Sequence, residues 1–83
     1  MKKVEIIFKS IYCDMCSYEI SVITKSIVGV ENFSIHRRTN TLIINFENKI
    51  SISIKELKEN FEKEGYPVLT IGLKNSNYAT TPF

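Results

Sequence analysis

Apolar residues recur along this chain with two different spacings, and the order of these spacings limits the possible folds. Alternating apolar and polar side chains are typical of a half-buried strand, whereas apolar side chains three and four residues apart are typical of an amphipathic helix. Strand-like spacing covers residues 3–9, 30–37, 42–46 and 68 to 72 or 73, and helix-like spacing covers residues 15–28 and 54–65. The sequence therefore predicts the element order βαββαβ.

The ends of these segments carry cap and turn signals. Residues 53–56 form a capping box, and Asp14 is a candidate N-cap for the first helix. Gly29 and Gly65 can end the two helices in the left-handed conformation, and Asn40 tolerates a turn between the second and third strands. Six elements in about 72 residues are too compact for a doubly wound sheet. We therefore predict an α+β, ferredoxin-like sandwich with a four-stranded antiparallel sheet and both helices on one face.

The inward side chains of these segments give one candidate core. Eighty-three residues with 43% hydrophobic content are enough for a single domain that needs no disulfide. We assign residues 1–73 to this domain and residues 74–83, which lack periodicity, to a loose C-terminal tail. The expected core residues are Val4, Ile6, Phe8, Ile20, Ile23, Ile27, Phe33, Ile35, Ile44, Phe46, Leu57 and Phe61.

The charge pattern excludes some classes of partner. A net charge of +2 is spread over 11 basic and 9 acidic residues, without the block of like charge that marks a surface for nucleic acid or an anionic membrane. The first apolar run is too short and too interrupted for a signal sequence or a membrane span. We expect a cytoplasmic protein without a nucleic-acid partner or membrane insertion. The initial methionine and the polar end favour a free protein over a piece of a transporter.

Cys13 and Cys16 are the only cysteines of the chain, and they lie where the first strand-like segment meets the first helix. The unpaired N–H groups at a helix start favour a thiolate over a thiol. A disulfide at this separation would close almost no loop, so a structural crosslink is set aside. Two adjacent thiolates can hold a soft metal ion or can form and break a disulfide, and this pattern leaves both chemistries open.

In this context the sequence resembles the heavy-metal-associated domain family over residues 2 to about 72. The resemblance rests on the C-x-x-C position, on Ile20 four residues after the second cysteine, on Gly29-Val30 after the first helix, and on residues 64–66, Glu-Gly-Tyr, before the last strand. The family includes small copper chaperones, metal-binding domains of metal-exporting P-type ATPases and mercuric-ion-binding proteins. The resemblance implies that Cys13 and Cys16 bind the metal.

The residues around the cysteines depart from the family pattern Gly-Met-Thr-Cys-x-x-Cys. Here Ser10, Ile11 and Tyr12 replace the first three residues. Ile11 matches the buried methionine of the family in volume, and Tyr12 is larger and is expected to cover the site. Tyr66 matches a tyrosine that bacterial copper chaperones of this family carry beside the metal loop. For Asp14 we favour the role of helix cap over that of metal ligand, but its carboxylate would favour a harder divalent ion if it reached the metal.

Thiolate ligands favour Cu(I), with Zn(II), Cd(II) or Hg(II) as other candidate ions. A closed structural zinc site needs four protein ligands, whereas this chain has two cysteines and one histidine. An incompletely filled coordination shell can accept cysteines from a partner. The resemblance therefore implies a metallochaperone-like carrier, not an enzyme, that exchanges ligands with a metal-transporting P-type ATPase or a related metal-binding domain. We expect a monomer that a shared metal ion can bridge into a dimer.

Two other functions stay open. A thiol–disulfide oxidoreductase also places C-x-x-C at a helix start, although thioredoxin-like proteins carry Trp-Cys-Gly-Pro-Cys and this motif has neither tryptophan nor proline. A degenerate metal domain that binds only a protein surface is the second alternative. His36 is expected on the solvent side of the second strand, a sheet length from the cysteines, and Met15 in an exposed position, so neither is a preferred ligand.

Overall fold

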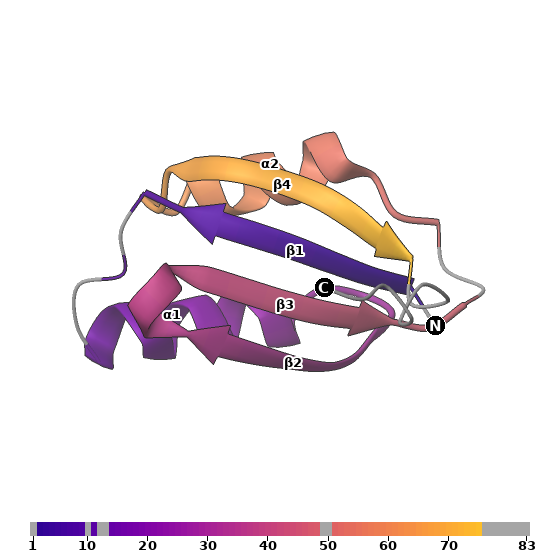
Figure 1. Cartoon of the computed structure of the whole chain (residues 1–83), viewed down its shortest axis with the longest axis horizontal. Helices are drawn as coiled ribbons and strands as arrows, with labels where there is room; N and C mark the ends of the chain where they lie inside the picture. The colour runs from indigo at the N-terminus through magenta and orange to yellow at the C-terminus, as the bar shows by residue number, and fades with distance from the viewer. Residues whose placement is uncertain (1, 10, 12–13, 49–50, 76–83) are drawn as a thin grey trace, which may run out of the picture.

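The structure is a computed structural model that describes residues 2–9, 11, 14–48 and 51–75 (Figure 1). These residues form the predicted order of strands and helices, with a short 3-10 helix, η1, between β2 and β3. The elements are β1 (Lys2–Phe8), α1 (Asp14–Lys25), β2 (Val30–His36), η1 (Arg37–Thr39), β3 (Thr41–Phe46), α2 (Ile54–Glu62) and β4 (Val68–Asn75). In this described part of the chain, no helix is long and apolar enough to cross a membrane.

The four strands form one sheet in the order β2-β3-β1-β4, and each neighbouring pair is antiparallel. Both helices lie behind this sheet in Figure 1, α1 on the side of β2 and α2 on the side of β4. The predicted ferredoxin-like fold is therefore confirmed. Since β1 and β2 both run antiparallel to β3, they end at the same end of the sheet, which is where α1 begins.

The core lies between the sheet and the helices. Eight of the expected core residues are buried, and the other four, Ile23, Ile27, Phe33 and Ile35, are half-buried and pack against them. Phe8 and Phe61 meet edge to face, with ring centroids 5.3 Å apart and planes at 72°, and so join β1 to α2. Leu42, Val68, Thr24 and Thr41 are also buried but are not among the expected core residues, and Ile11 is buried as the family resemblance implied.

The first helix ends three residues earlier than predicted. Residue 28 was the expected end, but α1 stops at Lys25. The main-chain N–H groups of Ser26 and Ile27 donate to carbonyl oxygens three residues back, at 3.1 and 3.0 Å, which is the pattern of a tightened last turn. Ser26 Oγ also donates to the Ile23 carbonyl at 2.7 Å, and this side-chain bond competes with a further helical turn.

The second helix starts as predicted but also ends three residues early, at Glu62 instead of residue 65. Ser53 Oγ accepts the Glu56 main-chain N–H at 3.2 Å, so the cap of α2 is confirmed. Gly29 and Gly65 have φ angles of +90° and +95°, the left-handed conformation expected after each helix. Arg37 was expected in the second strand but lies in η1, and β4 continues to Asn75, two residues beyond its predicted end.

Candidate functional site

Cys16 lies in the first turn of α1, where it is half-buried and packs against the core. Cys13 and Tyr12, as well as Ser10 and the side chain of Asp14, lie outside the described residues. The structure therefore places one of the two predicted ligands, at the end of the sheet where β1 stops. Three or more His, Cys, Asp or Glu side chains do not cluster as a metal site anywhere in the part of the chain that the structure describes.

The chain that leads from β1 to the cysteines is held from two sides. On one side, the main-chain N–H of Phe8 donates to the Asn40 carbonyl at 2.8 Å, and the N–H of Ile11 donates to Asn40 Oδ1 at 2.9 Å. On the other side, the N–H of Lys9 donates to the Pro67 carbonyl at 3.1 Å. The turn between β2 and β3 and the loop between α2 and β4 thus hold Phe8, Lys9 and Ile11, the described residues that lead from β1 toward the C-x-x-C pair.

The side chain of Ile11 also anchors this segment, by packing into the core. Its side chain is 6% exposed and belongs to the buried core cluster, which is the buried position that the family resemblance implied. Ile11 precedes Cys13 by two residues, so the chain is held in the core close to the C-x-x-C pair.

Tyr66 connects the loop before β4 to α1. Its phenol O–H donates to Glu19 Oε1, and its ring is half-buried against the core. Glu19 follows Cys16 by three residues on α1, and side chains at this spacing are neighbours on a helix surface. The structure therefore brings Tyr66 to the same part of α1 as Cys16. Sequence spacing gave no signal for this bond, because its partners are 47 residues apart.

His36 is exposed, and its Nε2 lies 3.1 Å from Ser34 Oγ. The predicted separation of a sheet length is wrong, because β1 and β2 end at the same end of the sheet. His36 is nevertheless on the opposite face from the helices, since the preceding residue, Ile35, packs against the core and strand side chains alternate. Met15 is 64% exposed, as expected.

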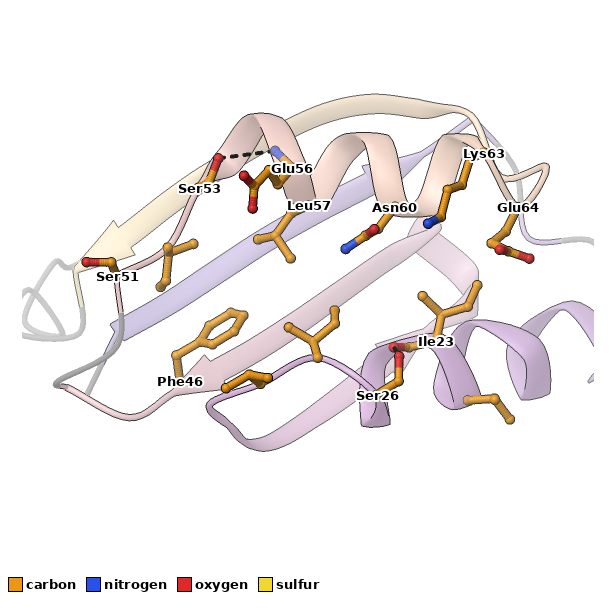
Figure 2. A pocket seen from close by; sticks show the side chains of 14 residues that line it. Ile23, Ser26, Phe46, Ser51, Ser53, Glu56, Leu57, Asn60, Lys63 and Glu64 are labelled. Carbon is orange, nitrogen blue, oxygen red and sulfur yellow. Dashed lines mark hydrogen bonds between the residues drawn. The ribbon is translucent and has the colours of Figure 1, made fainter.

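A groove of about 810 Å³ lies between the second half of α1 and α2 (Figure 2). Leu57 of α2 lines it from above in Figure 2, Ile23 of α1 from the right, and Phe46, the last residue of β3, from the lower left. Its lining includes none of the residues predicted for the metal site. The groove and the cysteine segment are therefore separate features of the helical face.

Neither the models of known protein families nor the curated protein sequences contain a match to this chain. Solved structures do match. They include oxidized MerP from Ralstonia metallidurans CH34, with 17% identity over 90% of this chain and 100% of that chain and a TM-score of 0.69. A copper binding domain from HMA7, a P-type ATPase, has 19% identity over 90% and 96% of the two chains and a TM-score of 0.71.

A third solved structure is the CopZ metallochaperone, with 15% identity over 81% of this chain and 98% of that chain and a TM-score of 0.71. At these identities the comparison shows a common fold. The structural neighbours are heavy-metal-associated domain proteins, and the resemblance stated from the sequence is confirmed at the level of the fold.

Proposed function

We propose that this chain binds a soft metal ion, preferentially Cu(I), through Cys13 and Cys16 and passes it to a partner by ligand exchange. The observation that carries the proposal is the position of Cys16 in the first turn of α1, within a fold shared with a P-type ATPase copper binding domain and a metallochaperone. Two thiolates and an otherwise open coordination shell suit a monovalent soft ion, whereas Zn(II) would lack two of its usual four ligands.

The surroundings of Cys16 support a carrier. Ile11 is buried in the core two residues before Cys13, and Tyr66 is half-buried against the same core, so both hold residues near the C-x-x-C pair in place. On the outer side of α1, Met15 and Tyr18 are 64% and 67% exposed, so the surface beside Cys16 is open to another protein. A carrier needs both properties, because its ion must be held and must also be reached by the cysteines of the acceptor.

The proposed partner is a metal-transporting P-type ATPase or a related metal-binding domain. The fold supports this proposal, because the chain shares it with a domain of a P-type ATPase and with a metallochaperone. Transfer between two such sites can pass through an ion held by cysteines of both proteins. The same chemistry would let two copies of this chain share an ion, so the proposed state is a cytoplasmic monomer that copper can bridge into a dimer.

The test is a titration of reduced protein with Cu(I) in the presence of a Cu(I) chelator, followed by competition with Zn(II). We expect one Cu(I) per molecule in the wild type, none at this affinity in a Cys13→Ser, Cys16→Ser variant, and no displacement of Cu(I) by equimolar Zn(II). Asp14→Ala serves as the second variant. Zn(II) displacing Cu(I) from the wild type but not from Asp14→Ala would overturn the copper assignment in favour of a divalent ion.

The two alternatives predict different results in this titration and in a separate assay of thiol–disulfide exchange with a model disulfide. An oxidoreductase would show thiol–disulfide exchange with a model disulfide and no stoichiometric metal binding. A degenerate domain would show neither property. Either result in reduced wild-type protein would contradict the proposed function.

A further inference from the structure

We propose that Asn40 is a positioning residue for the segment that carries the cysteines. It is 27 residues from Cys13 in the sequence, and it is not among the residues that the family resemblance implied for the site. The role of Asn40 in metal affinity rests on the proposed function, whereas its role in holding the segment stands on the structure alone.

Asn40 holds this segment at two points with two different groups. Its main-chain carbonyl accepts the N–H of Phe8, the last residue of β1, at 2.8 Å. Its side-chain Oδ1 accepts the N–H of Ile11 at 2.9 Å. Phe8 and Ile11 are themselves 1% and 6% exposed. Side chains packed in the core and N–H groups bound to Asn40 therefore fix the chain at Phe8 and at Ile11, two residues before Cys13.

The backbone of Asn40 explains why this residue type suits the position. Its φ and ψ angles are 54° and 37°, in the left-handed region, directly after η1. Asparagine visits this region more readily than most residues with a side chain, and glycine also does so without strain. Glycine, however, has no side-chain oxygen that could accept the N–H of Ile11. Asparagine combines the left-handed turn with a side-chain acceptor.

Because Ile11 is already fixed, metal binding costs less conformational entropy. Binding one ion between Cys13 and Cys16 confines Cys13 and the chain that leads to it from β1, and confinement of each residue opposes binding. Since Ile11 lies two residues before Cys13, its hydrogen bond removes part of this freedom before the ion arrives. Asn40 would thus raise the affinity without contact with the metal.

Three variants separate the two bonds of Asn40. Asn40→Gly keeps the left-handed backbone and the carbonyl bond to Phe8 but removes the acceptor for Ile11. Asn40→Asp keeps an oxygen acceptor in the same place. Asn32→Ala is the matched control, because it removes an asparagine side chain whose Oδ1 accepts from Asn45 Nδ2 nearer the other end of the sheet.

Two measurements on reduced protein test the proposal. Amide hydrogen exchange of metal-free protein should be about tenfold or more faster at Ile11 in Asn40→Gly, and unchanged there in Asn40→Asp and Asn32→Ala. The Cu(I) affinity, measured against a chelator, should fall about two- to tenfold in Asn40→Gly, which is the range expected for one hydrogen bond. It should recover in Asn40→Asp and stay at the wild-type value in Asn32→Ala.

Unchanged exchange at Ile11 in Asn40→Gly would overturn the proposal. So would an affinity loss in Asn40→Gly that Asn32→Ala reproduces, or one that Asn40→Asp does not reverse, because both would indicate a general structural effect. A failure of the proposed function looks different. Wild-type protein that binds no Cu(I), with exchange at Ile11 still faster in Asn40→Gly, would contradict metal carriage and would support the hold of Asn40 on the segment.

Discussion

Truncation of Phe61 tests whether the core holds the domain together without metal. Phe61 lies on α2, is 0% exposed, and meets the ring of Phe8 edge to face at 5.3 Å. Cys16, the cysteine that the structure describes, is half-buried beside this core and is not one of its buried residues. We therefore expect reduced, metal-free wild-type protein to unfold cooperatively and Phe61→Ala to remove much of its stability.

The size of the effect follows from the burial. Replacing a fully buried phenylalanine by alanine costs about 3–5 kcal/mol, of which an edge-to-face ring pair accounts for about 0.5–1.5 kcal/mol. A domain of 83 residues has a total stability of about 4–12 kcal/mol. Phe61→Ala should therefore be marginally folded at room temperature. Val28→Ala, at a side chain that is 80% exposed, should change the stability by less than about 0.5 kcal/mol.

Urea denaturation of metal-free protein, followed by far-UV circular dichroism under reducing conditions, measures these values. If Phe61→Ala is unfolded without urea, Phe61→Leu provides a folded variant with a smaller loss, and Phe8→Leu in the same background tests the ring pair. The reasoning would be refuted by a loss below about 1 kcal/mol in Phe61→Ala, since full burial predicts several times more. It would also be refuted if the wild-type chain gained its cooperative transition only after copper was added.

Two further substitutions test the surroundings of the cysteines. His36→Ala should leave the Cu(I) affinity within about twofold, because His36 is exposed on the sheet face opposite the helices; a loss above tenfold in the chelator titration would place it among the ligands. Tyr66→Phe should lower the stability towards urea by up to about 1 kcal/mol, because it removes the phenol bond to Glu19. Glu19→Gln keeps an acceptor and should lose less, and equal stability of Tyr66→Phe and wild type would show that the bond contributes nothing.

The fold was predictable because each local signal agreed with the next. Val4, Ile6 and Phe8 alternate along β1 and are all buried, Ser53 caps the start of α2, and the two glycines have the expected left-handed conformation in the loops after the helices. The errors lie at positions where a local bond competes with the pattern. The Ser26 side chain donates to the Ile23 carbonyl where α1 ends early, and Arg37 belongs to η1, directly before the left-handed turn at Asn40, instead of β2.

The surroundings of the cysteines were only partly predictable. The resemblance indicated Ile11 and Tyr66, and the structure places both near the first turns of α1. The partners that hold them, Asn40 and Glu19, are 29 and 47 residues away in the sequence, and their contacts depend on how the turn before β3, the loop before β4 and the start of α1 come together at one end of the sheet. Periodicity and spacing contain no information about such contacts. The sequence identified Asn40 as a turn residue, but not as an acceptor for Ile11.

The metal content of protein purified under reducing conditions from copper-supplemented cells tests most directly whether Cys13 and Cys16 bind the ion. The comparison is with the Cys13→Ser, Cys16→Ser variant, which changes two sulfur atoms and leaves the described core intact. We predict close to one copper per wild-type molecule and none in the variant. Equal copper content in the two proteins would contradict metal binding by this pair.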